Sequence, residues 1–349
     1  MVVLGIDAHK RSHTVVVVDD TGRKLGERTI ATTTADHLDL LSWAEQFGAD
    51  RLWAIEDCRQ LSRRLERDLL SIGQRIVRVP PKLMAHVRDS ARSYGKSDPI
   101  DALAVARAAL REPDLPTARL DGPAREVRLL VSHREDLVAE RTRIINRLRW
   151  HLHELDPSWQ PPARSLWRPK HLAATTARLQ GIDGMVARLA RALLERCRML
   201  SEEIAELDHE LEPLVARLAP ALIELCGCAT LTAAKILGET ADIERFHSRH
   251  AYARHNGTAP VPVWSGNRER HRLSRTGNRQ LNTALHRIAI TQARYHPPAR
   301  EFLQRRRAGG DTKAESIRAL KRRLSDVVYR ALLADAARSA PPAAITMAA

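Results

Sequence analysis

Runs of apolar residues in the first eighty positions predict a small unit of mixed strands and helices. Segments rich in β-branched residues indicate strands, and segments whose apolar residues recur every three or four positions indicate amphipathic helices. The expected strands are 2–7, 13–20, 25–33, 51–56 and 74–80, and the expected helices are 35–48 and 61–73. The element order is therefore β-β-β-α-β-α-β.

The middle of the chain has the apolar spacing of long packed helices. In residues 123–155 apolar side chains recur at Leu130, Leu137 and Ile144, every seven positions. A second stripe comprises Val186, Leu189, Leu193, Cys197, Leu200, Ile204, Leu207, Leu211, Leu214 and Leu218. Its steps alternate three and four, with one stutter at 193–197, which predicts an antiparallel coiled-coil hairpin within the chain or between chains. Cys197 lies on this seam, so we expect a core residue rather than a reactive thiol.

Together these patterns predict an α/β unit followed by an all-α part. The order β-β-β-α-β-α-β is shared by ribonuclease-H-like folds, which include nucleases, resolvases and transposases, and by some other α/β units. We expect a ribonuclease-H-like domain, a long coiled-coil middle that supports dimerisation, and a mostly helical C-terminal domain. The expected ranges are 1–118, 119–218, 219–336 and a disordered tail, rich in Ala and Pro, at 337–349.

Positive charge is confined to one quarter of the chain. The 349 residues carry a formal net charge of +15. Residues 245–330 contain 20 Lys and Arg but only 5 Asp and Glu, whereas both signs balance elsewhere. A local excess of this size is typical of a surface that binds a polyanion, although a solvated basic face without a partner has the same composition.

Cysteine usage and hydropathy indicate the redox compartment of the protein and the class of its partner. The four cysteines, Cys58, Cys197, Cys226 and Cys228, are too few and too scattered for a disulfide framework, which favours a reducing cytosol. No apolar run reaches the roughly 18 residues of a membrane span, so nucleic acid is the favoured partner. Cys226 and Cys228 flank a glycine before a helix, as in turns whose backbone N–H groups bind phosphate. A metal site there would need a second ligand pair.

Four carboxylates stand where predicted elements end or begin. Asp7 and Glu56 each end an apolar strand, and in a ribonuclease-H-like sheet these two strands are neighbours. Asp98 and Asp101 are three residues apart at the start of a helix, so both side chains can share one face. Oxygen-only ligands suit Mg²⁺, and two such ions about 4 Å apart can activate a phosphodiester. A structural alternative is that Asp98 caps the helix, with Asp101 completing a capping box.

The basic quarter contains the segment PVWSGNRERHRLSRTGNRQLN, residues 262–282. Its serine, Ser265, precedes a glycine that would let DNA approach the backbone closely. The arginines that could contact phosphates are Arg268, Arg270, Arg272, Arg275 and Arg279. Locally, Ser265 can also be an ordinary loop serine, because no nearby His or Asp forms a triad-like arrangement.

The motifs together resemble the insertion sequence family 110 transposases, DEDD recombinases with a RuvC-like N-terminal domain. GIDAHK, AIED and KSDPIDALAVA match the four-acid pattern, and LCGCATLTAAKILGETADIERF, NGTAPVPVWSGN and LSRTGNRQLNTAL match the C-terminal motifs in order. In this sequence DCRQ follows the second acid where the family has small residues, and Asp57 adds a carboxylate beside Glu56.

The resemblance implies a function for each motif. Asp7, Glu56, Asp98 and Asp101 fall on the family's Mg²⁺-binding tetrad (Mn²⁺ can substitute), and Ser265 falls on a nucleophile that forms a phosphoserine with DNA. It further implies a homo-oligomer, dimers assembling to a tetramer in which one protomer's serine works beside another's acids. Donor and target DNA would be selected by pairing with a structured bridge RNA, in the bacterial cytoplasm and on the nucleoid.

Two other functions remain compatible with the residues. A RuvC-like nuclease or resolvase would use the acids and a metal-activated water, and would not need Ser265. A non-enzymatic coiled-coil protein that binds nucleic acid would need only the basic surface, with the acids acting as caps.

Overall fold

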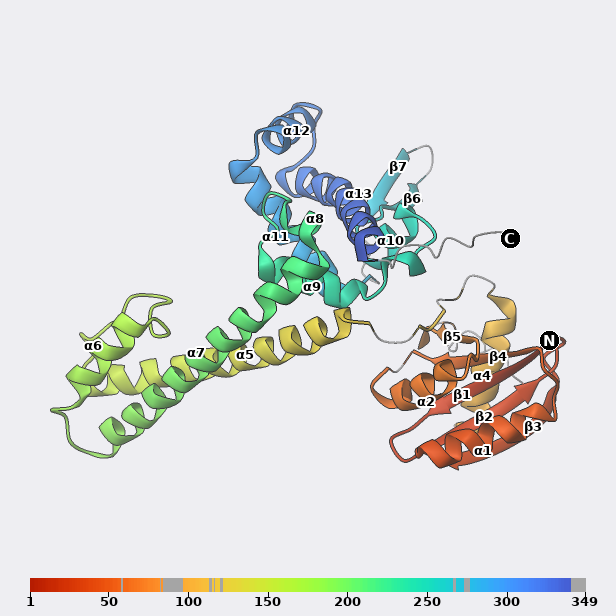
Figure 1. The fold of residues 1–349 in the computed structure, drawn as a ribbon. Coiled ribbons are helices and arrows are strands. Elements are labelled where there is room, and N and C mark those ends of the chain that lie inside the picture. The colour runs from red at the N-terminus through yellow and green to blue at the C-terminus, as the bar shows by residue number, and fades with distance from the viewer. Residues whose placement is uncertain are drawn as a thin grey trace, which may run out of the picture. The chain divides into compact units, whose positions relative to one another are not determined.

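The chain forms two compact units, Met1–Asp121 and Gly122–Ala349 (Figure 1). The computed structural model describes residues 1–57, 59–81, 83, 97–112, 115, 117–119, 122–265, 268–272 and 277–339. Cys58, Arg275 and most of the tail that we expected to be disordered lie outside these residues. Each unit is described by itself below.

The first unit is built on one five-stranded sheet. Its strands are β1 (Val2–Ala8), β2 (Ser12–Val18), β3 (Lys24–Ala31), β4 (Arg51–Glu56) and β5 (Ile76–Val79), in the order β3-β2-β1-β4-β5. β1 pairs antiparallel with β2 and parallel with β4, and β4 pairs parallel with β5. This mixed topology is the ribonuclease-H-like arrangement predicted from the element order, and it confirms that the first and fourth strands are neighbours.

Helices cover both faces of this sheet. They are α1 (Thr34–Glu45), α2 (Arg59–Ser71) and α4 (Asp98–Arg111). Along β1 the side chains alternate: Leu4 and Ile6 pack into the core shared with α1 and α2, whereas Val3 packs into the core shared with α4. The same alternation carries Gly5 and Asp7 to the α4 face. On β4, Ala54 packs with α4, so Glu56, two residues later, is directed to that face as well.

Two buried histidines lie between the sheet and α1. His13 on β2 is fully buried, and its ring stacks on that of His37 on α1 with centroids 5.7 Å apart. His37 Nδ1 lies 2.8 Å from Asp68 Oδ2, whereas neither ring nitrogen of His13 has a hydrogen-bond partner among the described residues. Burial, and then the positive charge of His37, lowers the pKa of His13 to about 4.

His13 should therefore make the first unit sensitive to acid. A histidine whose pKa is lower in the folded than in the unfolded state stabilises above pH 6.5 and loses that contribution as the pH falls towards 4. Between pH 7.5 and 5 we expect the loss to be about 2 kcal/mol for this residue. Amide hydrogen exchange in β1 and β2 measures it, and His13→Leu should remove about that much of the pH dependence. An exposed-site variant, His153→Gln on α5, is the control, and equal pH dependence in His13→Leu and wild type would refute the assignment.

The second unit begins with two long helices, α5 (Ala124–Leu155) and α7 (Met185–Leu218), linked through α6 (Pro169–Leu179). They run antiparallel, since Glu140 and Arg141, which follow His133 on α5, contact residues that precede the partner of His133 on α7. The contacts are His133 with Glu203, Glu140 with Arg196 and Arg141 with Ser201. A helix at α6 was not predicted from the sequence.

The buried stripe on α7 agrees with the predicted seam only in its C-terminal part. Cys197, Leu200, Ile204 and Leu211 are buried as predicted, which also confirms Cys197 as a core residue. Before the stutter the buried residues are Ala187, Ala190 and Leu194, one position after those predicted, and Leu189 is 41% exposed. The prediction failed there because the small alanines, rather than the larger neighbouring side chains, allow close approach of the packed elements.

The remaining elements pack against the first turns of α5 and the last turns of α7. They are α8 (Pro220–Ile223), α9 (Thr230–Thr240), a 3-10 helix (Ile243–Arg245), α10 (Arg249–His255), the hairpin β6 (Val261–Ser265) and β7 (Arg268–Arg272), α11 (Arg279–Tyr295), α12 (Pro297–Ala308) and α13 (Lys313–Ser339). One hydrophobic core joins Val127 of α5 and Leu211 of α7 to Ile236 of α9, Leu285 of α11 and Val328 of α13. The domain boundary expected at residue 218 therefore runs through a shared core.

Two further features of the second unit bear on function. α13 continues to Ser339, three residues into the segment expected to be disordered. Across the described residues, no helix has the length and apolarity required to traverse a bilayer.

Candidate metal centre

Asp7 and Glu56 lie side by side at the same edge of the sheet. β1 and β4 are parallel with Ile6 opposite Ile55, so the next residues on the two strands, Asp7 and Glu56, are at one level. Both are directed to the α4 face by the alternation of their strands. Asp7 is 4% exposed and Glu56 is partly buried.

A glycine on β1 brings α4 against this edge. A Cβ on Gly5 would lie 2.2 Å from the carbonyl oxygen of Ala102 and 2.4 Å from the amide nitrogen of Ala106, distances that no side chain can occupy. The absence of a side chain therefore lets α4 cross β1 in direct backbone contact. Asp98 and Asp101, both in the first turn of α4, are thereby held beside Asp7.

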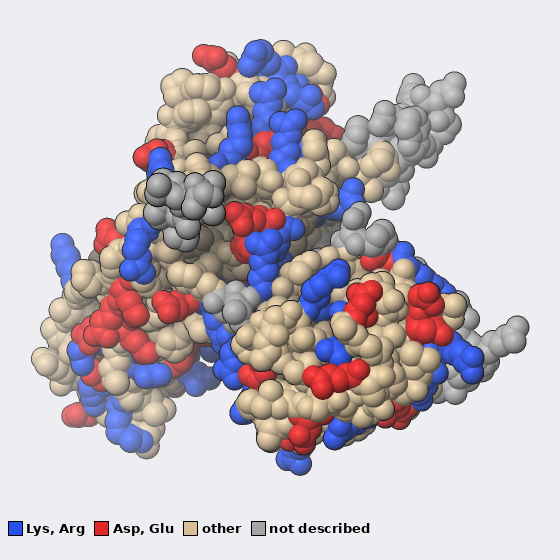
Figure 2. All heavy atoms as spheres, turned by 45° about the vertical axis from the view of Figure 1, so that its right-hand side comes forward, with Lys and Arg blue, Asp and Glu red and all other residues tan. Residues whose placement is uncertain are grey.

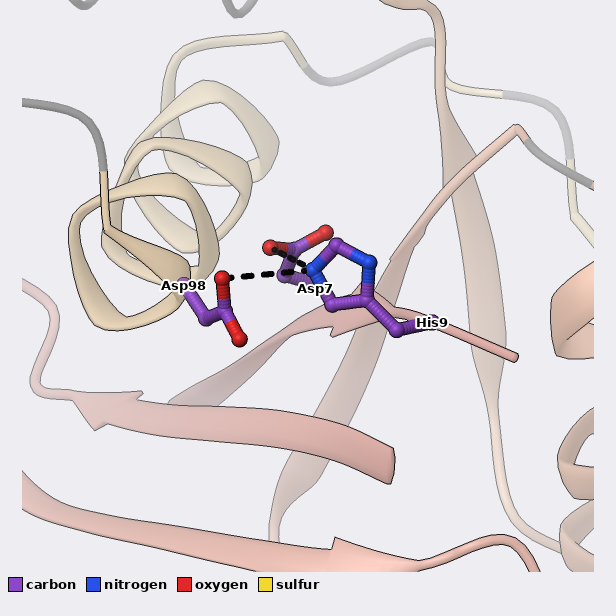
Figure 3. Close-up of side chains that lie close together, drawn as sticks. All are labelled: Asp7, His9 and Asp98. Atoms are coloured by element: carbon purple, nitrogen blue, oxygen red, sulfur yellow. Dashed lines mark hydrogen bonds and ion pairs between the residues drawn. The ribbon is translucent and has the colours of Figure 1, made fainter. Parts of the chain in front are cut away.

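The structure brings Asp7, Asp98 and His9 to one point (Figure 3). His9 Nε2 lies 3.0 Å from Asp7 Oδ2 and 3.3 Å from Asp98 Oδ1. One donor atom from each of the three residues lies within 4.8 Å of the other two, and among the described residues this is the one such group that could hold a metal ion. His9 was not singled out from the sequence, although it lies only two residues after Asp7, just beyond the end of β1.

The electrostatics of this point favour a bound cation. Burial raises the pKa of Asp7, and the negative charges of Asp101 and Asp98 raise it further, whereas His9 opposes the rise. A buried carboxylate beside two others is destabilised in its charged form until a positive charge approaches. The donor set of carboxylate oxygens and one imidazole thus fits a divalent metal ion.

Capping does not explain Asp98. α4 starts at Asp98 with Ser97 as its N-cap, and the Ser97 side chain makes no capping hydrogen bond. The first backbone bonds run from Ile100 and Asp101 to the Ser97 carbonyl. The capping alternative considered for Asp98 is therefore wrong, because the helix begins one residue earlier than it requires.

The serine and the arginines belong to the second unit. Ser265 is the last residue of β6, and in the hairpin register it pairs with Arg268, the first residue of β7. Arg270 and Arg272 occupy alternate positions along β7. Arg279 begins α11 and is exposed. The roles of Ser265 and of these arginines stay predictions, since the structure gives only their backbone positions.

Many arginines are also exposed on the C-terminal helices of this unit. Figure 2 shows Lys and Arg side chains gathered at the top of the view, where α12 lies. The exposed arginines of α11 and α12 are Arg279, Arg287, Arg294, Arg300, Arg305, Arg306 and Arg307. The confined positive charge predicted from the sequence is therefore at the surface.

The cysteine-containing turn between α8 and α9 is explained by its packing against α11 and not by metal binding. Gly227 adopts φ +87°, and a Cβ there would lie 3.0 Å from the Thr291 side chain on α11. Gln292 on α11 donates to the Cys226 carbonyl at 2.9 Å, which fixes the turn. Cys228 is buried, and burial raises its pKa to about 12, so it stays a thiol and packs in the core.

Comparisons with known proteins identify the family. Residues 4–157 match a family described as transposase, with the DEDD domain of IS110 elements, and residues 219–304 match the transposase IS116/IS110/IS902 family. The chain is 27% identical to an uncharacterized 44.8 kDa protein of insertion element IS116 from Streptomyces clavuligerus, covering 98% of this chain and 97% of that one. It is 28% identical to an uncharacterized 42 kDa protein of IS900 from Mycobacterium paratuberculosis, with 94% of each chain covered.

Two further comparisons cover shorter ranges. The transposase of insertion sequence element IS1111A from Coxiella burnetii is 26% identical over 59% of this chain and 58% of that one. Thermus thermophilus RuvC, solved in complex with a Holliday junction substrate, is 16% identical with a TM-score of 0.27, covering 34% of this chain and 99% of RuvC. The two family matches together span more than half of the sequence, in the order of the motifs, and the chain belongs to the IS110 family of insertion-element transposases.

Proposed function

We propose that the chain cuts and rejoins DNA at a divalent metal site formed by Asp7, Glu56, Asp98 and Asp101, with Ser265 as the nucleophile. The observation that carries the proposal is that Asp7 and Asp98, ninety-one positions apart, meet at one point. Burial and the neighbouring carboxylates disfavour the charged form of Asp7 there, which a bound cation would offset. A bound Mg²⁺ or Mn²⁺ would polarise the scissile phosphate there.

Each step of the proposed reaction conserves the phosphodiester bond energy. The Ser265 Oγ attacks the phosphorus and loses its proton, and the bond to the 3′ oxygen breaks as that oxygen takes up a proton. The products are a 5′-phosphoserine and a free 3′ hydroxyl. A 3′ hydroxyl of a second strand then attacks the phosphoserine, which restores the serine hydroxyl and completes strand transfer.

The basic surface supports nucleic acid as substrate and guide. The exposed arginines of α11 and α12, together with the arginines in the sequence of β7, would neutralise backbone phosphates without reading base sequence. We propose that an RNA encoded beside the transposase gene pairs with donor and target DNA and supplies that sequence choice. The serine of one protomer would act with the carboxylates of another, in dimers that pair to a tetramer, on the DNA of the bacterial nucleoid.

Reconstitution tests this function. Purified chain, RNA transcribed from DNA flanking the coding region, matching donor and target DNA and Mn²⁺ or Mg²⁺ should give joined strands and a protein–DNA adduct that survives denaturation. Omission of the RNA should abolish joining, and EDTA should abolish cleavage. Cleaved ends without an adduct would favour a resolvase-like nuclease that uses water. Binding without any cleavage would leave only a nucleic-acid-binding protein.

A further inference from the structure

His9 is the side chain that connects the two carboxylates of the candidate metal centre. Its Nε2 atom is within 3.3 Å of an oxygen of both Asp7 and Asp98, and those carboxylates come from different elements, β1 and α4. Figure 3 shows the ring directed to both carboxylates. The His9 ring therefore lies within the candidate metal centre, between its two carboxylates.

The separations are those between neighbouring ligands of one metal ion. Oxygen and imidazole ligands bind small divalent ions at about 2.1 Å. Two such ligands at a right angle lie about 3 Å apart. The distances from His9 Nε2, 3.0 Å to Asp7 and 3.3 Å to Asp98, are close to that value for both pairs.

The backbone holds His9 in this place. Its amide nitrogen donates to the Ser12 carbonyl at 2.9 Å, which closes the turn between β1 and β2. β1 on one side of the turn and β2 on the other are buried strands of the sheet. The imidazole therefore extends from a short turn whose two ends are fixed by buried strands.

We infer that His9 is a nitrogen ligand of the divalent ion at the site of Asp7 and Asp98. This inference rests on the proposed metal-dependent function and adds a residue to the four carboxylates. A nitrogen donor changes which ions the site prefers, because imidazole suits Mn²⁺ and later transition metals better than Mg²⁺, which prefers oxygen. The wild-type chain should bind Mn²⁺ more tightly than Mg²⁺ at this site.

Pulsed electron paramagnetic resonance of Mn²⁺ bound to the full-length chain tests the ligand directly. We expect nitrogen hyperfine coupling to the Mn²⁺ electron spin, with frequencies that shift when histidine alone is labelled with ¹⁵N. The coupling should vanish in His9→Ala and persist in His153→Gln, a control histidine on α5 in the second unit. Mn²⁺ affinity, measured in the same titration, should fall about 10–100-fold in His9→Ala, as when a group completing a metal site is removed.

A second variant separates ligation from folding. His9→Asp replaces the nitrogen by oxygen and should still bind both metals, while the ratio of Mn²⁺ to Mg²⁺ affinity falls about tenfold. Unchanged far-ultraviolet circular dichroism would show that each variant is folded. An unchanged affinity ratio in His9→Asp would contradict nitrogen ligation even where His9→Ala does not fold.

The result that would overturn the role of His9 differs from the result that would overturn the proposed function. Bound Mn²⁺ without histidine nitrogen coupling would overturn the role of His9 and leave the carboxylate site in place; His9 would then be a counter-ion that the metal displaces. Absence of any Mn²⁺ bound by the wild-type chain, with the same result in Asp7→Asn, would overturn both.

Discussion

Replacement of Asp7 by Asn is expected to abolish cleavage and joining while making the metal-free chain more stable. Loss of a buried carboxylate ligand removes several kcal/mol of metal-dependent stabilisation of the transition state, or on the order of 10³-fold in rate. The stability gain follows from the raised pKa of Asp7: in the folded chain its charged form is disfavoured by burial and by Asp101 and Asp98. A neutral amide of the same shape removes that cost.

The measurements are strand transfer with saturating metal and thermal unfolding in EDTA. Asp20→Asn, at an exposed aspartate in the turn between β2 and β3, makes the same change of charge in the same unit and should alter neither. A lower thermal stability of Asp7→Asn in EDTA would contradict this reason. It would mean that an interaction of the carboxylate with a neighbour stabilises the fold by more than its burial costs. Retained activity would remove Asp7 from the metal site.

Replacement of Ser265 by Ala should eliminate the covalent adduct and the joined product together. The proposed reaction has no other atom that can take the phosphoryl group from DNA, so joining should fall below about 10⁻³ of the wild-type rate, the usual scale for loss of a nucleophile. Binding of DNA and RNA should change less than about twofold, because phosphate contacts depend on arginine charge.

The control for Ser265 is another serine in the basic region. Ser248 caps α10 by accepting a hydrogen bond from the Ala251 amide at 3.2 Å. Ser248→Ala should cost about 1 kcal/mol of stability and leave the adduct intact. Normal joining by Ser265→Ala would show that another group, or water, is the nucleophile.

Most of the sheet could be predicted from the sequence because three of its strands, β1, β2 and β4, are strongly apolar. β1, β2 and β4 lie where runs of β-branched and apolar residues predicted them, and the element order left few arrangements of the sheet. The expected adjacency of β1 and β4 then placed Asp7 beside Glu56 from the sequence alone. Helix α6, PKHLAATTARL, was missed because it has few large apolar residues, and one of its buried positions is the polar Thr175.

The close packing of helices could not be predicted because it depends on positions where a side chain is small or missing. Gly5 is unremarkable within a strand, yet its missing Cβ lets α4 approach and sets the position of Asp98 and Asp101. The shift of the buried stripe to Ala187, Ala190 and Leu194 on α7 has a similar cause, since apolarity alone favours the larger neighbours. His9 was missed because its role depends on Asp98, which is distant in sequence.

Anomalous diffraction from crystals grown with Mn²⁺ tests the central claim most directly, namely that the carboxylates of the first unit converge on a divalent ion. We expect an anomalous peak at about 2.1–2.3 Å from oxygens of Asp7 and Asp98, with Glu56 and Asp101 around the same ion or a second one. A crystal at saturating Mn²⁺ with no peak at Asp7, or with the ion bound elsewhere in the chain, would contradict the account.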